Sequence, residues 1–397
     1  MARRRFLAGS VGLGALWAAS VGGSSRAAPA PTGKLRAAVI GHTGRGNYGH
    51  EHDVIFNDYE HIQVAAVADP DAAGRASAAA RCRALRQYAD YHQMLVQEKP
   101  QLVCVAPRWT DQHHAMALAA LQAGAHVYLE KPIAQTLAQA DELLATAARA
   151  GLKIAVAHQM RLAPNVVALQ RAVAAGLLGD LLEIRAHGKQ DARAGGEDLI
   201  VLGVHLFDLM RLFAGDALWC TARVTQSQHD IGLDDAHAAT EDIGPVAGDE
   251  IQAQFAFPSG VNATFISRAK HRAVAGHWGL ELVGSKARAR ILADIFPAVL
   301  LAEEGDWQPA GKTTAWRPWK DDPTLNASTQ ERSVRRANRR VVDDWLAAIS
   351  ENREPVCSGR NGMKALEMAL AVFQAGLSAD RVKLPLAERG HPLTAKA

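Results

Sequence analysis

A lysine that follows a predicted strand is placed to contact a substrate hydroxyl group. Lys131 lies in the sequence YLEKP beside Glu130, and Pro132 stiffens the turn that follows. In open α/β sheets, ligands bind outside the carboxyl ends of the strands, so this ammonium group can reach a bound hydroxyl. A second EKP sequence, at residues 98–100, precedes its strand instead, and we expect it at the opposite, non-binding edge of the sheet.

A histidine close to two carboxylates is suited to proton transfer. His205 begins a segment in which apolar residues recur at helical spacing, which by itself is typical of a structural histidine. Glu197 and Asp198 precede it closely, and carboxylates beside an imidazole favour acid–base chemistry, so we expect all three to be catalytic. The sequence HGKQDARAGGED adds Lys189, Asp191 and Arg193 as candidate pocket residues, with solvated strand-end charges as the alternative.

A glycine-rich segment, GHTGRG at residues 41–46, follows an apolar run and is predicted to bind the phosphates of a dinucleotide. Thr43 stands where the pattern G-x-G-x-x-G has its second glycine, and the alternative is a plain tight turn. We expect the Thr43 hydroxyl to donate to the pyrophosphate and Arg45 to neutralise or cover the phosphates. The expected contacts in this loop are Gly41, Thr43, Gly44, Arg45 and Gly46.

An acidic residue at the end of the next predicted strand supports the dinucleotide interpretation. Asp69 can accept hydrogen bonds from the adenosine ribose hydroxyls, which favours NAD. A 2′-phosphate would be repelled by this carboxylate, although Arg75 in the following helix leaves NADP possible. The three histidines at positions 42, 50 and 52 lack a firmly placed fourth ligand, so we expect no metal site.

The elements that must position these residues alternate between strands and helices. Up to about residue 158, strand-like runs and helical patterns alternate as in βαβ units on a parallel sheet. Beyond residue 161, longer alternating segments predict a largely antiparallel sheet with one solvated or site-lining face. The predicted strands of the first half cover 35–41, 62–70, 101–107, 125–132 and 152–161, and its helices cover 49–58, 72–85, 113–124 and 137–151.

These patterns predict an α/β protein of two domains. We expect an N-terminal Rossmann domain with a doubly wound parallel sheet at 34–158, and a C-terminal α+β domain with an open, mostly antiparallel sheet at 159–390. The 397 residues exceed the size at which single cores stop growing.

A formal charge of only +3 disfavours nucleic-acid binding. The four cysteines form no C-x-x-C pair, and the acidic segment 229–250 is predicted to be a solvated loop, with a cover over the site or an oligomer contact as alternatives.

The first 32 residues have the layout of a secretory signal peptide. A basic start is followed by a Gly/Ala-rich apolar segment and then by small residues and prolines. Arg3, Arg4, Phe6 and Leu7 fit the twin-arginine pattern R-R-x-F-L. We therefore expect export of the folded protein to the periplasm, with an uncleaved anchor as the alternative.

The order of these motifs resembles the glucose-fructose oxidoreductase and inositol dehydrogenase family (Gfo/Idh/MocA). The glycine loop is followed by Asp69, by AGAHVYLEKP with His114 before it, by AHQMRLAP, by GLLGD and by the His205 helix. The resemblance continues through GSKARARI to the closing GMKALEMALAVFQAGLSADRVKLPL, so it covers nearly everything after the signal.

The resemblance implies a Rossmann domain that holds NAD(P) and a second domain that covers the nicotinamide and forms a sugar pocket. It makes Lys131 and His205 the catalytic pair. It places Arg161 with Lys131, Lys189, Arg193 and His205 at the substrate. Further cofactor contacts are expected at Pro107, Trp109, His114, Glu130 and Gln159.

One departure from the family pattern bears on the activity. The family motif D-x-G-x-H has an aspartate where this chain has Val201, whereas Glu197 and Asp198 stand about one turn earlier. We expect hydride transfer with a sugar, sugar derivative or glycoside by a homo-oligomer. A glycosidase or lyase that oxidises its substrate transiently is the alternative, and a nucleotide-bound sugar sensor is a third possibility.

Overall fold

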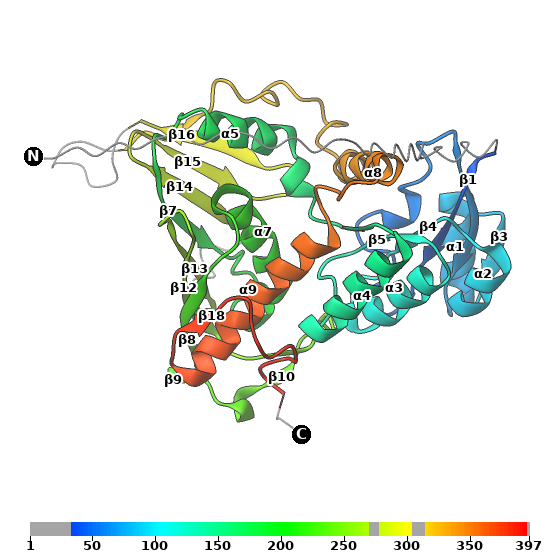
Figure 1. Cartoon of the computed structure of the whole chain (residues 1–397), viewed down its shortest axis with the longest axis horizontal. Helices are drawn as coiled ribbons and strands as arrows, with labels where there is room; N and C mark the ends of the chain where they lie inside the picture. The colour runs from blue at the N-terminus through cyan, green and yellow to red at the C-terminus, as the bar shows by residue number, and fades with distance from the viewer. Residues whose placement is uncertain (1–32, 270–277, 304–313, 395–397) are drawn as a thin grey trace, which may run out of the picture. The chain divides into compact units, whose positions relative to one another are not determined.

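The computed structural model describes residues 33–269, 278–303 and 314–394 (Figure 1). The predicted twin-arginine signal at 1–32 lies outside the described residues. Among the described helices, none is long and apolar enough to span a membrane.

The first half of the chain forms a six-stranded sheet in which every pair of strands is parallel. The strand order is β3-β2-β1-β4-β5-β6, so the winding direction reverses between β1 and β4. The predicted doubly wound sheet is confirmed, and the carboxyl ends of β1 and β4 form the switch point at which such sheets bind ligands. Its strands are β1 (Leu35–Ile40), β2 (Ile62–Ala68), β3 (Arg86–Tyr88), β4 (Leu102–Val105), β5 (His126–Leu129) and β6 (Ile154–Val156).

Four helices connect these strands, and three of them begin at a side chain that caps the first turn. Asp71, Asp90 and Thr136 accept hydrogen bonds from backbone amides at the starts of α1, α2 and α4. Strand β3 and helix α2 were not predicted from the sequence, because β3 is a short and largely exposed edge strand. The helices are α1 (Ala72–Cys82), α2 (Tyr91–Glu98), α3 (His113–Gln122) and α4 (Leu137–Ala150).

The helix predicted at 49–58 is wrong. The structure has only the single 3-10 turn η1 (His52–Val54) there, within a series of turns. Asn47 and Glu51 have positive φ angles of 53° and 58°, a conformation that an α-helix does not contain. The glycine loop therefore leads into turns rather than directly into a helix.

The second half of the chain contains a ten-stranded sheet in the order β17-β16-β15-β14-β7-β13-β12-β8-β18, with β9 paired to β8. Among the described strands of this sheet, β7 and β13 alone pair in parallel, so the expected mostly antiparallel sheet is confirmed. A separate pair joins β10 (His237–Ala238) to β11 (Pro245–Val246). The large sheet consists of β7 (Leu181–His187), β8 (Trp219–Gln226), β9 (His229–Asp230), β12 (Glu250–Ala256), β13 (Asn262–Arg268), β14 (Gly279–Gly284), β15 (Arg288–Leu292), β16 (Ala298–Ala302), β17 (Arg317–Pro318) and β18 (Val382–Lys383).

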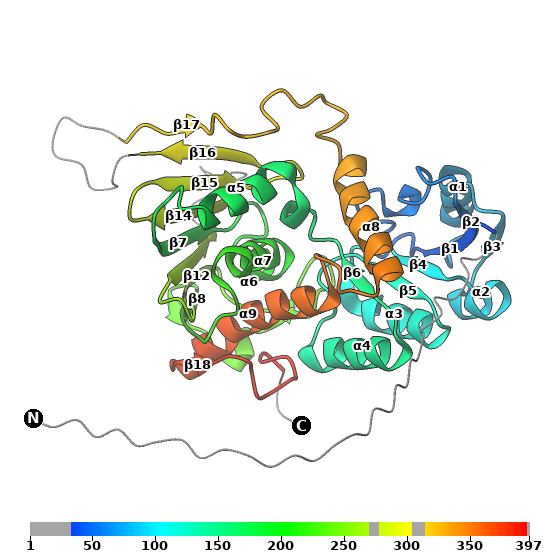
Figure 2. The same ribbon diagram turned by 45° about the horizontal axis from the view of Figure 1, so that its top comes forward.

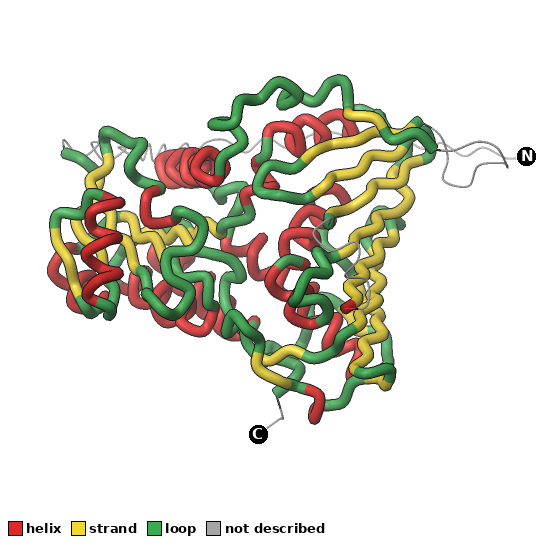
Figure 3. Tube along the Cα trace, turned by 180° about the vertical axis from the view of Figure 1, so that it is seen from behind, coloured by secondary structure: helices red, strands yellow, loops and turns green. Residues whose placement is uncertain are grey.

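Helices cover one face of this large sheet (Figures 2 and 3). They are α5 (Pro164–Ala174), α6 (Gly196–Val201), α7 (Gly203–Ala214) and α9 (Gly359–Ser378). Helix α8 (Val334–Glu351) packs instead against the core of the parallel sheet, where Trp345 lies 6.2 Å from the ring of Tyr128. The two halves thus meet at the carboxyl ends of β4, β5 and β6, which is where the site lies.

Candidate functional site

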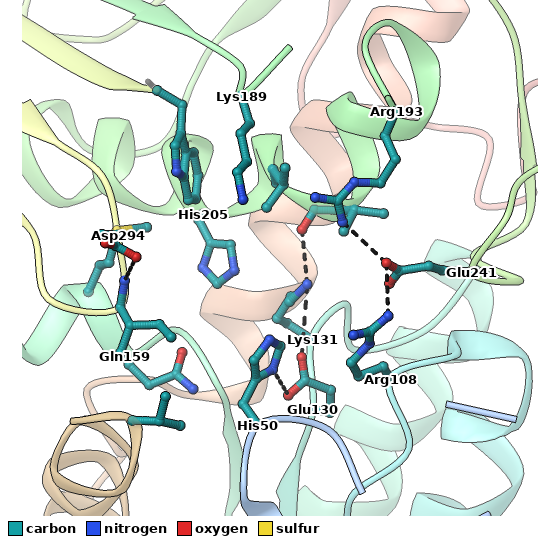
Figure 4. A pocket seen from close by; sticks show the side chains of 16 residues that line it. His50, Arg108, Glu130, Lys131, Gln159, Lys189, Arg193, His205, Glu241 and Asp294 are labelled. Atoms are coloured by element: carbon teal, nitrogen blue, oxygen red, sulfur yellow. Dashed lines mark hydrogen bonds and ion pairs between the residues drawn. The ribbon is translucent and has the colours of Figure 1, made fainter. Parts of the chain in front are cut away.

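A cavity of about 310 Å³ lies at the carboxyl ends of the parallel strands and is lined by both halves of the chain (Figure 4). Loops after β4, β5 and β6 contribute one side, and the β7–α6 loop and helix α7 contribute the other. The polar side chains that line it are His50, Arg108, Glu130, Lys131, Gln159, Lys189, Arg193, His205, Glu241 and Asp294.

Lys131 is buried at the base of the cavity. Its Nζ donates a 3.0 Å hydrogen bond to the carbonyl oxygen of Val201 and lies 3.9 Å from Glu130 Oε1. The backbone of Val201 thereby orients the ammonium group at the very position where the family has an aspartate. Burial lowers the pKa of Lys131, although the neighbouring carboxylates of Glu130 and Glu241 act in the opposite direction.

Glu130 is buried among basic side chains. Its Oε2 lies 3.1 Å from His52 Nδ1 and 3.5 Å from His50 Nδ1. Burial alone would raise the pKa of Glu130, but these histidines and Lys131 hold it well below its usual range. Glu130 is therefore an ionised carboxylate that forms an ion pair with Lys131.

His205 faces the same cavity from the first turn of α7. Its Nδ1 is buried and has no hydrogen-bond partner among the described residues. The rings of His158 and Trp278 lie 5.3 Å and 6.0 Å from it, centroid to centroid. Burial, with Lys131 and His158 adding to it, lowers the pKa of His205 well below its ordinary value. The imidazole is consequently neutral and able to accept a proton near neutral pH.

Neither Glu197 nor Asp198 lines the cavity, and their expected catalytic roles stay predictions that this placement does not support. Asp198 is buried and accepts hydrogen bonds from Ser267 Oγ at 2.6 Å and from the backbone amides of Lys189 and Gln190. Glu197 accepts hydrogen bonds from the hydroxyl and the backbone amide of Thr240. Both carboxylates hold loops whose neighbouring residues do reach the cavity.

Lys189 and Arg193 lie where the sequence predicted them, in the wall of the cavity. Lys189 Nζ lies 3.9 Å from Asp191, and Arg193 donates a 2.7 Å hydrogen bond to the same carboxylate. Arg193 also reaches Glu241 at 3.2 Å. Lys189 is thus the less firmly held of the two cations.

Arg161, by contrast, does not line the cavity and is paired with Asp208, so its expected contact with the substrate stays a prediction. Its Nε donates to both carboxylate oxygens of Asp208 at 2.9 and 3.0 Å, and its Nη2 reaches the Asp208 carbonyl. This buried pair joins the 3-10 turn η3 (Gln159–Leu162) to α7. Although burial acts against it, Arg161 holds the pKa of Asp208 well below its usual range.

The glycine loop lies at the switch point, but two of its side chains are already engaged. Thr43 donates from its hydroxyl to Asp69 at 2.8 Å, and its expected donation to a pyrophosphate stays a prediction. Arg45 is bound by Asp111 at 2.7 Å and by Asp242 at 2.5 Å, which leaves it paired rather than free to cover phosphates. The backbone amides of Thr43, Gly44 and Arg45 are engaged as well, by Asp69, Asn47 Oδ1 and the His42 carbonyl.

The backbone of this loop fits a phosphate-binding turn. Gly44 has a φ of +86° and open space where a Cβ would stand. Gly46 has a φ of +84°, and a Cβ there would come within 2.4 Å of the backbone nitrogen of Trp109. Only glycine permits this close approach between the loops after β1 and β4. Gly41 likewise packs directly against the ring of Tyr48.

A second cavity, of about 170 Å³, lies beside the loop and fits the adenosine half of a dinucleotide. It is bounded by Gly41, by Asp69 at the end of β2 and by residues 89–91 after β3. The Asp69 carboxylate is buried and accepts hydrogen bonds from Thr43 and from the Asp71 amide. The two cavities flank the glycine loop along one edge of the parallel sheet, as an extended dinucleotide requires.

Two further predicted cofactor contacts, His114 and Trp109, lie outside both cavity linings. The His114 ring lies 2.8 Å from Glu142 on α4, so its contact with the cofactor stays a prediction. The neighbouring His113 is instead buried, with its ring nitrogens 2.7 Å from the carbonyl oxygens of Pro107 and Pro132. Trp109 lies under the guanidinium of Arg45, 5.6 Å away, and outside both cavity linings.

Gln159 does line the main cavity. Its amide nitrogen donates to Asn338 Oδ1 at 2.7 Å, and Asn338 in turn donates to the His50 carbonyl.

Sequence reasoning missed two carboxylates, Glu241 and Asp294, that line the same cavity. The acidic segment 229–250 was the available signal for Glu241. Within residues 33–269, 278–303 and 314–394, no cluster of three metal-binding side chains exists.

Comparison with known proteins agrees with this architecture. Residues 35–158 match the Gfo/Idh/MocA family model described as an NAD-binding Rossmann fold of an oxidoreductase family, and residues 176–384 match that family's C-terminal α/β domain. D-apiose dehydrogenase of Paraburkholderia graminis is 25% identical over 369 residues, which cover 90% of this chain and 92% of that protein. Myo-inositol 2-dehydrogenase of Thermotoga maritima is 26% identical over 232 residues, which cover 56% of this chain and 65% of that protein.

Solved structures share the fold at low identity. Levoglucosan dehydrogenase in complex with NADH and L-sorbose has a TM-score of 0.70 at 17% identity, covering 89% of this chain and 100% of that one. An oxidoreductase domain protein from Kribbella flavida has a TM-score of 0.69 at 22% identity, with the same coverage.

Proposed function

Because this chain belongs to the Gfo/Idh/MocA family of NAD-binding oxidoreductases, we propose that it transfers hydride between bound NAD and a hydroxyl-bearing carbon of a sugar, sugar derivative or glycoside. One observation carries the proposal: Lys131 and His205 line one cavity beside a glycine loop at the sheet's switch point. Relatives named as D-apiose, myo-inositol and D-glucoside dehydrogenases support a sugar as the substrate.

In this reaction, His205 would act as the base and Lys131 would orient the reacting hydroxyl. Bound NAD supplies the hydride acceptor. His205, held neutral by burial, takes the proton from the substrate hydroxyl. Lys131 donates a hydrogen bond to the same oxygen, while the Val201 carbonyl and Glu130 fix the direction of its ammonium group. The proton then resides on the His205 imidazole, close to the ring of His158.

The cofactor would lie across both cavities. The tight turn at Gly44 and Gly46 would leave room for the pyrophosphate, and the cavity beside Asp69 would hold the adenosine. Pro107, Glu130 and Gln159 stand at the nicotinamide end of this path, since they belong to the loops after β4, β5 and β6. The engaged Asp69 carboxylate keeps negative charge beside the ribose, which favours NAD over NADP.

The decisive experiment measures the identity and the redox state of the bound nucleotide. The purified protein is denatured, the released nucleotide is identified, and its redox state in the native protein is followed across a panel of sugars and glycosides. Net reduction by a sugar supports the proposal. Release of an aglycone without net reduction indicates the redox-assisted glycosidase instead, although Glu197 and Asp198, which first suggested that chemistry, lie outside the cavity. Absence of any bound or bindable nucleotide contradicts hydride transfer.

Export and self-association complete the proposal. Arg3, Arg4, Phe6 and Leu7 support delivery to the periplasm by the twin-arginine route, which carries folded, cofactor-loaded enzymes. Replacing Arg3 and Arg4 by lysine should retain the protein inside the cell.

The sheet face opposite the helices carries the exposed side chains of Gln252, Gln254 and Leu292 and suits a partner copy. Light scattering in solution tests this self-association.

A further inference from the structure

Glu241 enters the cavity from a segment that the sequence assigned to a solvated loop. It lies between β10 and β11, and its side chain is only 13% exposed. Figure 4 shows its carboxylate beside Arg108 and Arg193, which approach from opposite halves of the chain. A carboxylate buried at this depth among substrate-binding candidates calls for a functional explanation.

Its neighbours on both sides are anchored, so Glu241 is held in place. The preceding residue, Thr240, is bound by Glu197. The following residue, Asp242, is bound through its carboxylate to Arg45 and through its carbonyl to Gln135 at 3.0 Å. These contacts come from both halves of the chain, which pre-organises the Glu241 carboxylate at the cavity wall.

The carboxylate neutralises two cations through a single oxygen. Arg108 Nη2 and Arg193 Nη1 donate to Glu241 Oε1 at 3.1 and 3.2 Å. Among the described contacts, Oε2 therefore remains available to a bound hydroxyl. The arginines keep further N–H groups for hydroxyl oxygens, but they present no uncompensated charge.

The charges in and directly beside the cavity balance as a whole. Four cations line the cavity, Arg108, Lys131, Lys189 and Arg193, together with the three carboxylates Glu130, Glu241 and Asp294. Beside the cavity, Asp191 supplies a fourth carboxylate, which pairs with Lys189 and Arg193. A carboxylate on the substrate would add a fifth negative charge and would lie near Glu241 in a partly buried site, where like charges repel more strongly than in water.

We propose that Glu241 determines specificity by making this cavity select an uncharged sugar over the corresponding sugar acid. The inference rests on the proposed sugar oxidation and names its substrate class. Oε2 of Glu241 accepts a hydroxyl of the ring, and its charge cancels that of Arg108 and Arg193, which would otherwise recruit a carboxylate.

The test compares binding of glucose and glucuronate, which differ by one carboxylate, to the NADH-loaded protein. Quenching of tryptophan fluorescence reports both affinities, since Trp278 lines the cavity. We expect the wild type to bind glucose more tightly, and Glu241→Gln to shift the ratio of the two affinities toward glucuronate by about tenfold or more. Arg108→Met, which removes a positive charge from the same cluster, should shift the ratio in the opposite direction.

The ratio of the two affinities, measured on one preparation, is insensitive to partial misfolding, because misfolding lowers the apparent binding of glucose and of glucuronate alike. The matched control is Asp234→Asn, which removes an exposed carboxylate from the same acidic segment, 229–250, and should leave the ratio unchanged. A wild type that prefers glucuronate, or an unchanged ratio in both Glu241→Gln and Arg108→Met, overturns the inference. If glucose binds as expected but neither glucose nor any other sugar or glycoside of the panel is oxidised, the proposed function fails while the specificity assignment stands.

Discussion

Lys131 and Lys99 stand in the same tripeptide, Glu-Lys-Pro, and only their positions in the fold separate them. Lys131 is buried after β5 and bound to Val201, whereas Lys99 is exposed at the end of α2 and precedes β4. We predict that Lys131→Met lowers turnover by about 10²–10⁴-fold, the usual contribution of a positioned proton-transfer group. Lys99→Met is the matched control and should leave turnover unchanged; equal turnover in the two variants would refute the assignment of Lys131.

The two proposed catalytic groups predict the pH profile of kcat/KM. His205 works as a neutral base, and burial lowers its pKa well below the ordinary value, so activity should persist below pH 6.5. Lys131 works as a cation, and burial lowers its pKa, so activity should fall on the alkaline side before a free lysine would lose its proton. Stopped-flow or steady-state rates across pH test both limbs, and an acidic limb at or above pH 6.5 would exclude His205 as the base.

Among the elements, η3 and α7 are joined by the buried ion pair of Arg161 and Asp208. Removing one partner of such a pair leaves an uncompensated charge, so Arg161→Leu should lower the free energy of unfolding by about 3–5 kcal/mol. Urea unfolding measures this. The exposed pair of Arg223 and Asp230 provides the control, since Arg223→Leu should cost at most about 1 kcal/mol.

The same variant decides between the two interpretations of Arg161. A structural residue outside the cavity should leave KM for the sugar close to that of the wild type in the folded fraction. A large rise in KM without loss of stability would restore the substrate contact that the sequence suggested.

Local patterns predicted most of the elements, and the exceptions have local causes. Periodicity located α3 and α4 because each buries one face. The helix expected at 49–58 failed because positive φ angles at Asn47 and Glu51 turn the chain, and side-chain periodicity does not report φ.

For the whole molecule, buried histidines predict a loss of stability in mild acid. Burial lowers the pKa values of His52, His126 and His391 to about 4. Between pH 6.5 and about 4 the unfolded chain therefore binds more protons than the folded one, and the free energy of unfolding falls as the pH falls through this window. The low pKa values of Glu130 and Asp208 extend the loss to lower pH.

Thermal unfolding at a series of pH values measures this dependence. The slope of the melting temperature against pH should decrease in His391→Gln. This variant removes one of the three histidines, at a position far from the glycine loop. A melting temperature that stays constant or rises between pH 7 and pH 4.5 would contradict the assignment of neutral buried imidazoles.

The sequence by itself determined the two sheets, the glycine loop at the switch point and the positions of Lys131 and His205, because strand and helix periodicities and turn residues are local signals. Only the tertiary structure decided which charges face the cavity. Glu197 and Asp198 lie near His205 in sequence yet bind Thr240 and Ser267. Glu241 pairs with Arg108, 133 residues away, because the folding of both halves brings their loops to one edge of the parallel sheet. Side-chain partners at such separations are set by how the elements pack, which no local pattern records.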